Sequence, residues 1–151
     1  FLCLVAFKKI AYPKAAVNPP DTNNLVEYGK YLVTGRYDCY PCHSKDFKTM
    51  NMEFPEKSGG YLGGGNKMVA LSGETRYTAN ITPDKETGIG AWTEDDFANA
   101  MRHQKNKAGH TLRDPMLPYN GMTDLEVKAI WAYLLTVPPI KNVVDRQWDK
   151  D

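Results

Sequence analysis

The pattern of apolar and polar residues predicts a first helix over residues 25–37. Its apolar positions recur at helical spacing, at Leu25, Tyr28, Leu32 and Val33. Asn24, followed three residues later by Glu27, resembles a capping box, which marks the start of a helix. Gly29 lies in the middle of this helix, where a glycine costs about 1 kcal/mol relative to alanine. We therefore expect Gly29 to let another helix approach closely.

A second helix is predicted over residues 94–104. Thr93 precedes it as the capping residue, and Phe97 and Met101 share one apolar face. Acidic residues begin this helix and Arg102 lies near its end, which is the distribution of charge that the helix dipole favours. We expect the face that carries Phe97 and Met101 to pack against the core.

The last helix has the clearest pattern. Thr123 and Glu126 form a capping box, and Pro138 and Pro139 stop the helix. Between them runs one apolar stripe, made of Val127, Ile130, Trp131 and Leu134. No strand pattern competes with these three helices, so we expect the regular structure to be helical.

Between the first two helices, residues 44–91 show no sustained periodicity. They contain eight glycines: Gly59, Gly60, Gly63, Gly64, Gly65, Gly73, Gly88 and Gly90. We interpret them as a long loop region. A compact domain seldom contains so much irregular chain unless the chain wraps around something, so this region indicates a cofactor.

Length and charge narrow the class of protein. The chain has 151 residues, about one domain on the usual length scale, and 42% of them are hydrophobic. Nineteen basic and eighteen acidic residues give a net charge of +1. Nucleic-acid binding needs a broad basic surface, so we expect no nucleic-acid partner.

The chain divides into three parts. Residues 1–23 begin with seven largely apolar residues and continue as a tether that contains prolines. Seven helical residues rise only about 10 Å, against a hydrocarbon core of about 30 Å. We interpret them as the end of a truncated membrane anchor or signal-type segment. Residues 24–140 are predicted to form the folded domain, and residues 141–151 a C-terminal tail.

The motif that carries chemistry is Cys-x-x-Cys-His, formed by Cys39, Cys42 and His43. This spacing is typical of the covalent attachment of a c-type haem. Two thiols three positions apart can each add to a vinyl group of the porphyrin, while the next residue presents its imidazole to the iron from the same side. We expect one haem c bound through Cys39 and Cys42, with His43 as an iron ligand.

Three other uses of the cysteine pair fit less well. A thioredoxin-like dithiol needs a strand before the motif, and here the pair closes a helix. A structural zinc needs four ligands, and the spacing of His103 and His110 does not match a zinc finger. A disulfide between Cys39 and Cys42 would close a short, strained loop.

The sixth iron ligand is predicted to be Met116. It lies between Pro115 and Pro118 on a stiff loop just before the last helix, and it belongs to no helical stripe. Met101 shares the core-facing stripe of its helix, and Met122 can pack against the helix that follows it. The alternatives that stay open are His103, His110, Met50, Met52 and Met68.

With these features the chain resembles the single-haem class I cytochrome c family. More narrowly, it is similar to the cytochrome c domains and subunits of bacterial membrane-bound dehydrogenases and respiratory complexes. The resemblance covers roughly residues 25–139. Besides the haem motif it rests on residues 80–84 (Asn-Ile-Thr-Pro-Asp), 88–92 (Gly-Ile-Gly-Ala-Trp), the Met116 loop and 122–134. It implies an all-α class I cytochrome c fold, with three main helices and long loops wrapped around one covalently bound haem.

The same resemblance implies roles for three more residues at the cofactor. Pro55 would accept a hydrogen bond from Nδ1 of His43, Trp92 would reach a haem propionate with its indole N–H, and Asn80 would lie on a loop beside the haem. The alternatives are a turn proline and a tryptophan that only packs against the following helix. In this family the first and last helices cross closely, so Gly29 is expected to face Ile130, Trp131 or Leu134.

The function implied is one-electron transfer by a haem with His/Met ligation, in an electron carrier rather than an enzyme. We expect redox proteins as donor and acceptor, and a place as a membrane-associated carrier or as a subunit of a larger electron-transfer complex. A periplasmic or outward-facing location follows from the resemblance. A basic group near Met116 is predicted to orient an acidic partner: Arg102, Lys105, Lys107 and Arg113. The rival function is a haem enzyme or gas sensor with an open sixth position.

Overall fold

The computed structural model describes residues 18 and 20–146, and the structural statements below concern these residues. The predicted apolar anchor and most of the tether lie outside them. Within the described part of the chain, no helix combines the length and the apolar character that a membrane crossing requires. The elements given below surround a single core, whose largest fully buried side chains are Leu32, Leu62, Ile130 and Leu134.

The first helix forms where it is predicted, with a change of pitch in the middle. Helix α2 spans Leu25–Tyr31 and continues into η1, a stretch of π-helix over Leu32–Arg36. The side chain of Asn24 accepts a hydrogen bond from the backbone N–H of Glu27 at 3.3 Å, which caps the helix start. Both Leu32 and Val33 are fully buried at the change of pitch.

The two later helices begin at their predicted capping residues, and the capping box predicted for the last helix is confirmed. Helix α4 spans Glu94–His103 and helix α5 spans Asp124–Leu134. At the start of α4, Thr93 and Asp96 exchange hydrogen bonds between side chain and backbone, and Thr123 and Glu126 do the same at the start of α5. Helix α4 ends one residue earlier than predicted, because Gln104 has a left-handed backbone conformation with φ 53°.

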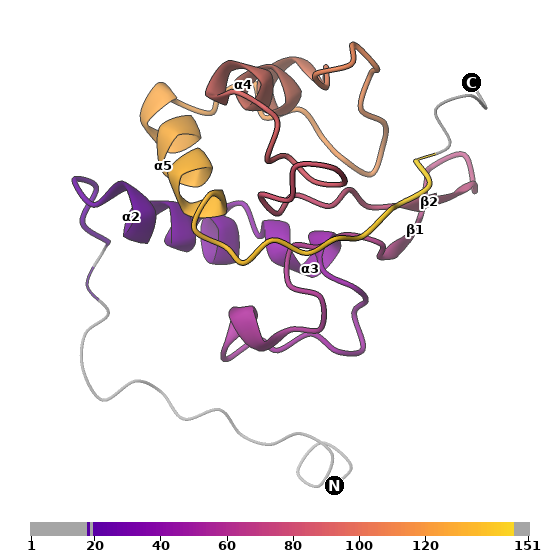
Figure 1. Cartoon of the computed structure of the whole chain (residues 1–151), viewed down its shortest axis with the longest axis horizontal. Helices are drawn as coiled ribbons and strands as arrows, with labels where there is room; N and C mark the ends of the chain where they lie inside the picture. Colours follow the sequence, from indigo (N-terminus) through magenta and orange to yellow (C-terminus); the bar gives the residue numbers. More distant parts are fainter. Residues whose placement is uncertain (1–17, 19, 147–151) are drawn as a thin grey trace, which may run out of the picture.

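Helices α2 and α5 cross at close range (Figure 1). A Cβ atom added at Gly29 would overlap the carbonyl oxygen of Ala129 and lie 2.7 Å from Cβ of Tyr133. The predicted close approach is therefore confirmed, but the expected neighbours of Gly29 are corrected. Ala129 and Tyr133, one turn apart, form the face of α5 that meets α2, whereas Ile130 and Leu134 face the cavity described below.

The expectation of purely helical structure is wrong for one short region. Strand β1, Lys67–Val69, pairs antiparallel with strand β2, Thr75–Tyr77, and Met68 lies opposite Arg76. A single turn of 3₁₀-helix, η2, also forms at Pro55–Lys57. Strands of three residues are too short to show the alternation by which a strand is recognised in a sequence. The remainder of the region from residue 44 to 91 is loop, as predicted.

After α5 the chain runs back across the loop region (Figure 1). The side chain of Asn80 donates a hydrogen bond to the carbonyl of Ile140 at 2.7 Å, and the amide of Asn142 donates to the carbonyl of Gly63 at 2.9 Å. The beginning of the predicted tail therefore packs on the domain. We call residues 137–146 the C-terminal strap.

Candidate functional site

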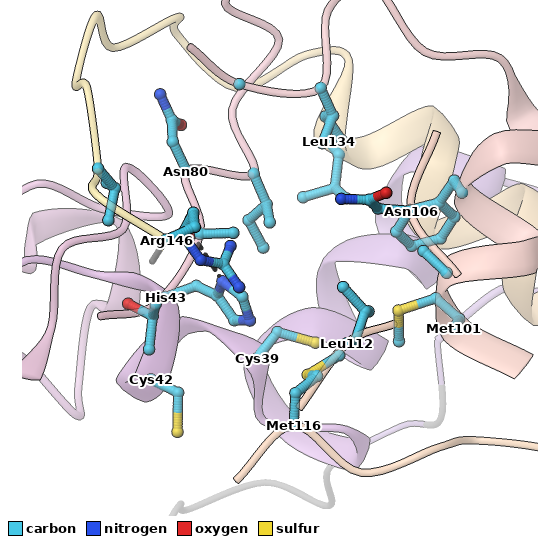
Figure 2. A pocket seen from close by; sticks show the side chains of 18 of the residues that line it. Cys39, Cys42, His43, Asn80, Met101, Asn106, Leu112, Met116, Leu134 and Arg146 are labelled. Atoms are coloured by element: carbon cyan, nitrogen blue, oxygen red, sulfur yellow. Dashed lines mark hydrogen bonds between the residues drawn. The ribbon is translucent and has the colours of Figure 1, made fainter. Parts of the chain in front are cut away.

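One cavity of about 290 Å³ brings together four of the residues predicted to bind the cofactor: Cys39, Cys42, His43 and Met116. Most of its remaining wall is apolar and comes from η1, α4, α5 and the loops, with Val33, Ile81, Ile89, Phe97, Ile130 and Leu134 among the lining residues. Figure 2 shows Cys39 and His43 of the haem motif at this cavity, with Met101 from α4 and Met116 from the following loop beside it.

The haem motif forms its own short helix. Helix α3, Cys39–His43, follows η1 after a sharp change of direction at Asp38, whose φ of 49° lies in the left-handed region. The end of α3 is held by the glycine-rich loop, because the backbone N–H of Gly64 donates to the carbonyl of His43 at 2.7 Å. The amide of Asn66 likewise donates to the carbonyl of Pro41 at 3.0 Å.

The orientation of His43 leaves one ring nitrogen for a metal. Its Nδ1 lies 2.9 Å from the carbonyl oxygen of Ala79. A carbonyl only accepts, so Nδ1 carries the proton and Nε2 keeps its lone pair. Burial lowers the pKa of His43, which keeps the imidazole neutral, as metal binding requires.

The expectation for Pro55 is corrected by this contact. The carbonyl of Pro55 accepts from the backbone N–H of Ser58 at 3.0 Å and closes the turn of η2. Pro55 also does not line the cavity. It is the turn proline of the alternative interpretation, and Ala79 takes the role of hydrogen-bond acceptor for the imidazole. Every residue carries a backbone carbonyl, so no sequence signal could have identified the one at Ala79, 36 residues away from His43, as the acceptor.

The two thiols of the motif are held in their protonated form. Burial, together with the nearby Asp38, raises the pKa of Cys39 to about 12 and raises the pKa of Cys42. Thiolate-dependent redox chemistry needs a lowered thiol pKa. Among the described residues, no group of three or more His, Cys, Asp or Glu side chains is placed to hold a metal ion. The raised thiol pKa disfavours the thioredoxin-like dithiol alternative.

The cavity narrows the candidates for a sixth ligand to three methionines. Met68 from β1, Met101 from α4 and Met116 line it, whereas Met50, Met52 and Met122 do not. His103 and His110 are exposed and also lie outside the cavity lining. Met101 is buried in the core, and Met116 lies on the loop before α5, partly buried against that core. Its carbonyl accepts a hydrogen bond from the side chain of Gln104 at 2.9 Å.

Asn80 and Trp92 both line the cavity, with different freedom to contact a cofactor. The amide nitrogen of Asn80 donates to Thr87 and Ile140, and its oxygen accepts two hydrogen bonds from Thr82. Figure 2 shows this amide directed away from His43. Asn80 therefore organises the surrounding loop with its polar atoms. Trp92 is partly buried beside the core, and its expected contact with a propionate stays a prediction.

Three arginines line the cavity, and none of them was singled out from the sequence as a cofactor ligand. Arg76 forms ion pairs with Glu74 and Asp114, which leaves two further arginines to consider. Arg113 and Arg146 both line it, and Arg146 lies near His43 (Figure 2). Burial and the like charge of Arg113 lower the pKa of Arg146. A cavity with two guanidinium groups suits a ligand that carries carboxylates. Arg146 lies in the segment predicted to be a tail, so its role was not visible in the sequence.

These features fit a haem. The cavity has apolar walls for the porphyrin, two neutral thiols, an imidazole with a lone pair on Nε2, a thioether and two guanidinium groups for carboxylates. No fully buried side-chain nitrogen or oxygen among the described residues lacks a hydrogen-bond partner.

The predicted basic group is partly neutralised by neighbouring carboxylates. Arg102 forms an ion pair with Asp124 at 2.8 Å, and Lys107 with Asp96 at 3.4 Å. Exposed ion pairs of this kind contribute little to stability, but they weaken the positive field that steering requires. The structure therefore gives less support to an acidic docking partner than the sequence alone suggests.

The cavity and the residues that line it have the features expected of a c-type cytochrome. No family model matches the chain. It is 40% identical over 114 residues to the gluconate 2-dehydrogenase cytochrome c subunit of Pantoea cypripedii, an alignment that covers 74% of this chain and 23% of that protein. It is 34% identical over 119 residues to the fructose dehydrogenase cytochrome subunit of Gluconobacter japonicus, covering 76% of this chain and 22% of that protein.

A third relative is the cytochrome c subunit of the quinone-dependent alcohol dehydrogenase of Gluconacetobacter polyoxogenes. It is 34% identical over 133 residues, which cover 86% of this chain and 25% of that protein. The chain thus spans a quarter or less of the length of these curated relatives. The predicted resemblance to cytochrome c subunits of dehydrogenases is confirmed. These relatives imply a class I cytochrome c fold and covalently bound haem c.

Proposed function

We propose that this chain is an electron-transfer domain that carries one haem c, bound covalently through Cys39 and Cys42, with His43 and Met116 as axial ligands. The observation that carries the proposal is the convergence of these four side chains on one largely apolar cavity. Bound there, the haem supplies an iron that takes up and releases one electron, and His/Met ligation raises its reduction potential relative to other axial sets.

The protein's own residues position and protect such a group. Ala79 fixes the ring orientation of His43 through the hydrogen bond at Nδ1, which also makes Nε2 a better ligand. The apolar walls formed by Val33, Phe97 and Ile130 keep water from the site. A thioether supplied by Met116 would fill the sixth position. These features favour an electron carrier over a haem enzyme or gas sensor, which needs that position open.

We place this carrier in a larger dehydrogenase complex, because the relatives are named as cytochrome subunits of gluconate, fructose and alcohol dehydrogenases. Its donor and acceptor would then be redox proteins or subunits of that complex. A periplasmic or outward-facing location, with membrane association through the N-terminal segment, belongs to the same proposal.

Haem attachment and electron transfer are tested on the full chain produced in a bacterium that attaches haem in its periplasm. We expect a mass increase of one haem and a red pigment that stays with the protein in acidified acetone. A redox titration is expected to follow a one-electron Nernst curve, about 59 mV per tenfold change in the ratio of oxidised to reduced protein. A colourless protein, or a pigment extracted by the acid, would contradict the proposal.

The ligand Met116 is tested by substitution to alanine. In the oxidised wild-type protein we expect the weak far-red absorption band of sulfur-to-iron charge transfer. Met116→Ala is expected to abolish this band, lower the reduction potential, and let the reduced protein bind carbon monoxide. The matched control is Met52→Ala, since Met52 is 73% exposed and lies outside the cavity lining.

Two outcomes would change the proposal, one for the sixth ligand and one for the function. Retention of the band in Met116→Ala and its loss in Met101→Ala or Met68→Ala would transfer the ligand role to that methionine. Strong binding of carbon monoxide by the wild-type protein would instead favour the enzyme or gas-sensor alternative.

A further inference from the structure

The loop that carries Met116 is tied to the β1–β2 hairpin at Asp114. One carboxylate oxygen of Asp114 accepts a hydrogen bond from Nη1 of Arg76 at 2.6 Å, and the other accepts from the backbone N–H of Leu71 at 2.6 Å. The same Nη1 also donates to the backbone carbonyl of Asp114 at 2.9 Å. Both the side chain and the backbone of Asp114 are thus held by the hairpin, two residues before Met116.

Arg76 is well placed to act as a fixed anchor. Its second terminal nitrogen, Nη2, donates to the carboxylate of Glu74 at 2.8 Å, so the guanidinium plane is held on both sides. The side chain of Arg76 is only 17% exposed and that of Asp114 30%. A partly buried, charge-assisted pair of this kind is stronger than an ion pair on the open surface.

The backbone hydrogen bonds of Met116 itself come from its own loop and from the end of α4. Its N–H donates to the carbonyl of Arg113 at 3.1 Å, and its carbonyl accepts from the side chain of Gln104. Neither hydrogen bond connects the Met116 loop to the β1–β2 hairpin. Pro115 restricts the backbone between Asp114 and Met116, so a displacement of Asp114 is passed on to Met116.

We propose that Arg76 is a positioning residue for Met116: through Asp114, the β1–β2 hairpin holds the thioether at the cavity and keeps the sixth iron position closed. This inference rests on the proposed axial role of Met116. A thioether is a neutral, soft ligand, so its bond to iron depends on placement within a fraction of an ångström. In this protein a short hairpin outside the haem motif supplies that placement.

The test compares Arg76→Ala with wild type in the haem-loaded protein. We expect Arg76→Ala to reduce the far-red sulfur band by at least half and to bind cyanide to the oxidised iron at least tenfold more tightly. Arg76→Lys, which keeps the charge without the forked geometry, is expected to restore part of the band. Glu74→Gln keeps a side-chain oxygen that accepts from Nη2 of Arg76, so the guanidinium stays held and cyanide affinity is expected to remain within twofold of wild type.

Two further variants separate positioning from general stability. Thr123→Ala removes the cap of α5 and is expected to lower the unfolding temperature without changing the sulfur band. In a Met116→Ala background, Arg76→Ala is expected to have no additional effect on cyanide binding, because the ligand that it positions is absent.

Each outcome decides a separate point. The positioning role is overturned if Arg76→Ala leaves the sulfur band and the cyanide affinity unchanged. It is also overturned if Arg76→Ala changes cyanide affinity as much in the Met116→Ala background as in the wild-type protein. If Arg76→Ala does not fold, Asp114→Asn decides in its place, because it weakens the ion pair and keeps an acceptor for the N–H of Leu71. A wild-type protein without any sulfur band overturns the proposed ligand itself and is recognised before any Arg76 variant is made.

Discussion

The two sides of the cavity are built in opposite ways. On the His43 side, the two thiols and the imidazole come from five consecutive residues that form helix α3. On the Met116 side, the proposed ligand lies on a loop that accepts hydrogen bonds from Arg76, 38 residues away from Asp114 in the sequence, and from Gln104 just after α4. The cofactor-binding residues of the first side thus come from one local motif, although Ala79 orients the imidazole, whereas the second side is assembled by long-range contacts.

This difference predicts which side opens first. Loops held by a few polar contacts open at lower free energy than segments joined to the core. Once haem is bound, covalent bonds to Cys39 and Cys42 would keep it attached on the His43 side, whereas Met116 would hold the iron through a coordinate bond alone. We therefore expect ligand exchange and tuning of the potential to occur on the Met116 side. Three substitutions test this contrast.

The largest effect is expected from removing both thiols of the motif. Cys39→Ala combined with Cys42→Ala should abolish covalent attachment, because these are the two cysteines that line the cavity. Mass spectrometry of the purified chain and extraction into acidified acetone measure the loss. Cys3→Ala, outside the motif, is the matched control and should retain the full mass increase. Covalent haem in the double variant would contradict the role given to α3.

A large effect on stability is expected at the crossing that supports both sides. Helix α2 leads through η1 into α3, and α5 follows the Met116 loop. Gly29→Ala would force its new methyl group into Ala129, which should lower the free energy of unfolding by about 2–3 kcal/mol. Urea unfolding of the haem-loaded protein measures this loss.

The matched control for the crossing is Gly35→Ala. A Cβ at Gly35 meets only the ring of Tyr31, at 3.9 Å, so this variant should be close to neutral or slightly more stable. The folded fraction of Gly29→Ala should keep the wild-type sulfur band. A stable Gly29→Ala protein would show that α2 and α5 do not meet as described.

The smallest effect is expected from the contact of Met116 with the end of α4. Gln104→Asn shortens the side chain that donates to the carbonyl of Met116, and asparagine tolerates the left-handed backbone at this position. We expect a loss of about 1 kcal/mol in the free energy of unfolding, with cyanide binding tightened only a few-fold. Extraction into acid should be unchanged, since the His43 side is not touched. An effect on cyanide binding larger than that of Arg76→Ala would place the main support of Met116 on α4 instead of the hairpin.

Much of the helical framework was predictable from the sequence. Thr93 and Thr123 mark the starts of α4 and α5, because capping depends on residues three positions apart. The haem motif is equally local. Gly29 predicted a close helix crossing, although the rotation of α5 that brings Ala129 and Tyr133 to it depends on how the two helices pack.

The contacts that the sequence did not predict are long-range. The hairpin consists of two strands of three residues, which are too short to show a period. The acceptor for His43 is a backbone carbonyl, so residue type did not distinguish Ala79 from Pro55. Arg146 reaches the cavity only because the C-terminal strap folds back, and such a path is set by tertiary structure.

The C-terminal strap also bears on the order in which the chain is completed during synthesis. The carbonyl of Ile140 accepts a hydrogen bond from the side chain of Asn80, which lies 60 residues earlier. The side chain of Asn142 donates to the carbonyl of Gly63, which lies 79 residues earlier. The motif of α3 therefore emerges from the ribosome long before the loops beside it can settle. Contacts of such sequence separation form late. The cavity beside α3 is completed by a segment translated about a hundred residues after it. In a nascent chain the two cysteines of α3 would therefore be exposed to solvent.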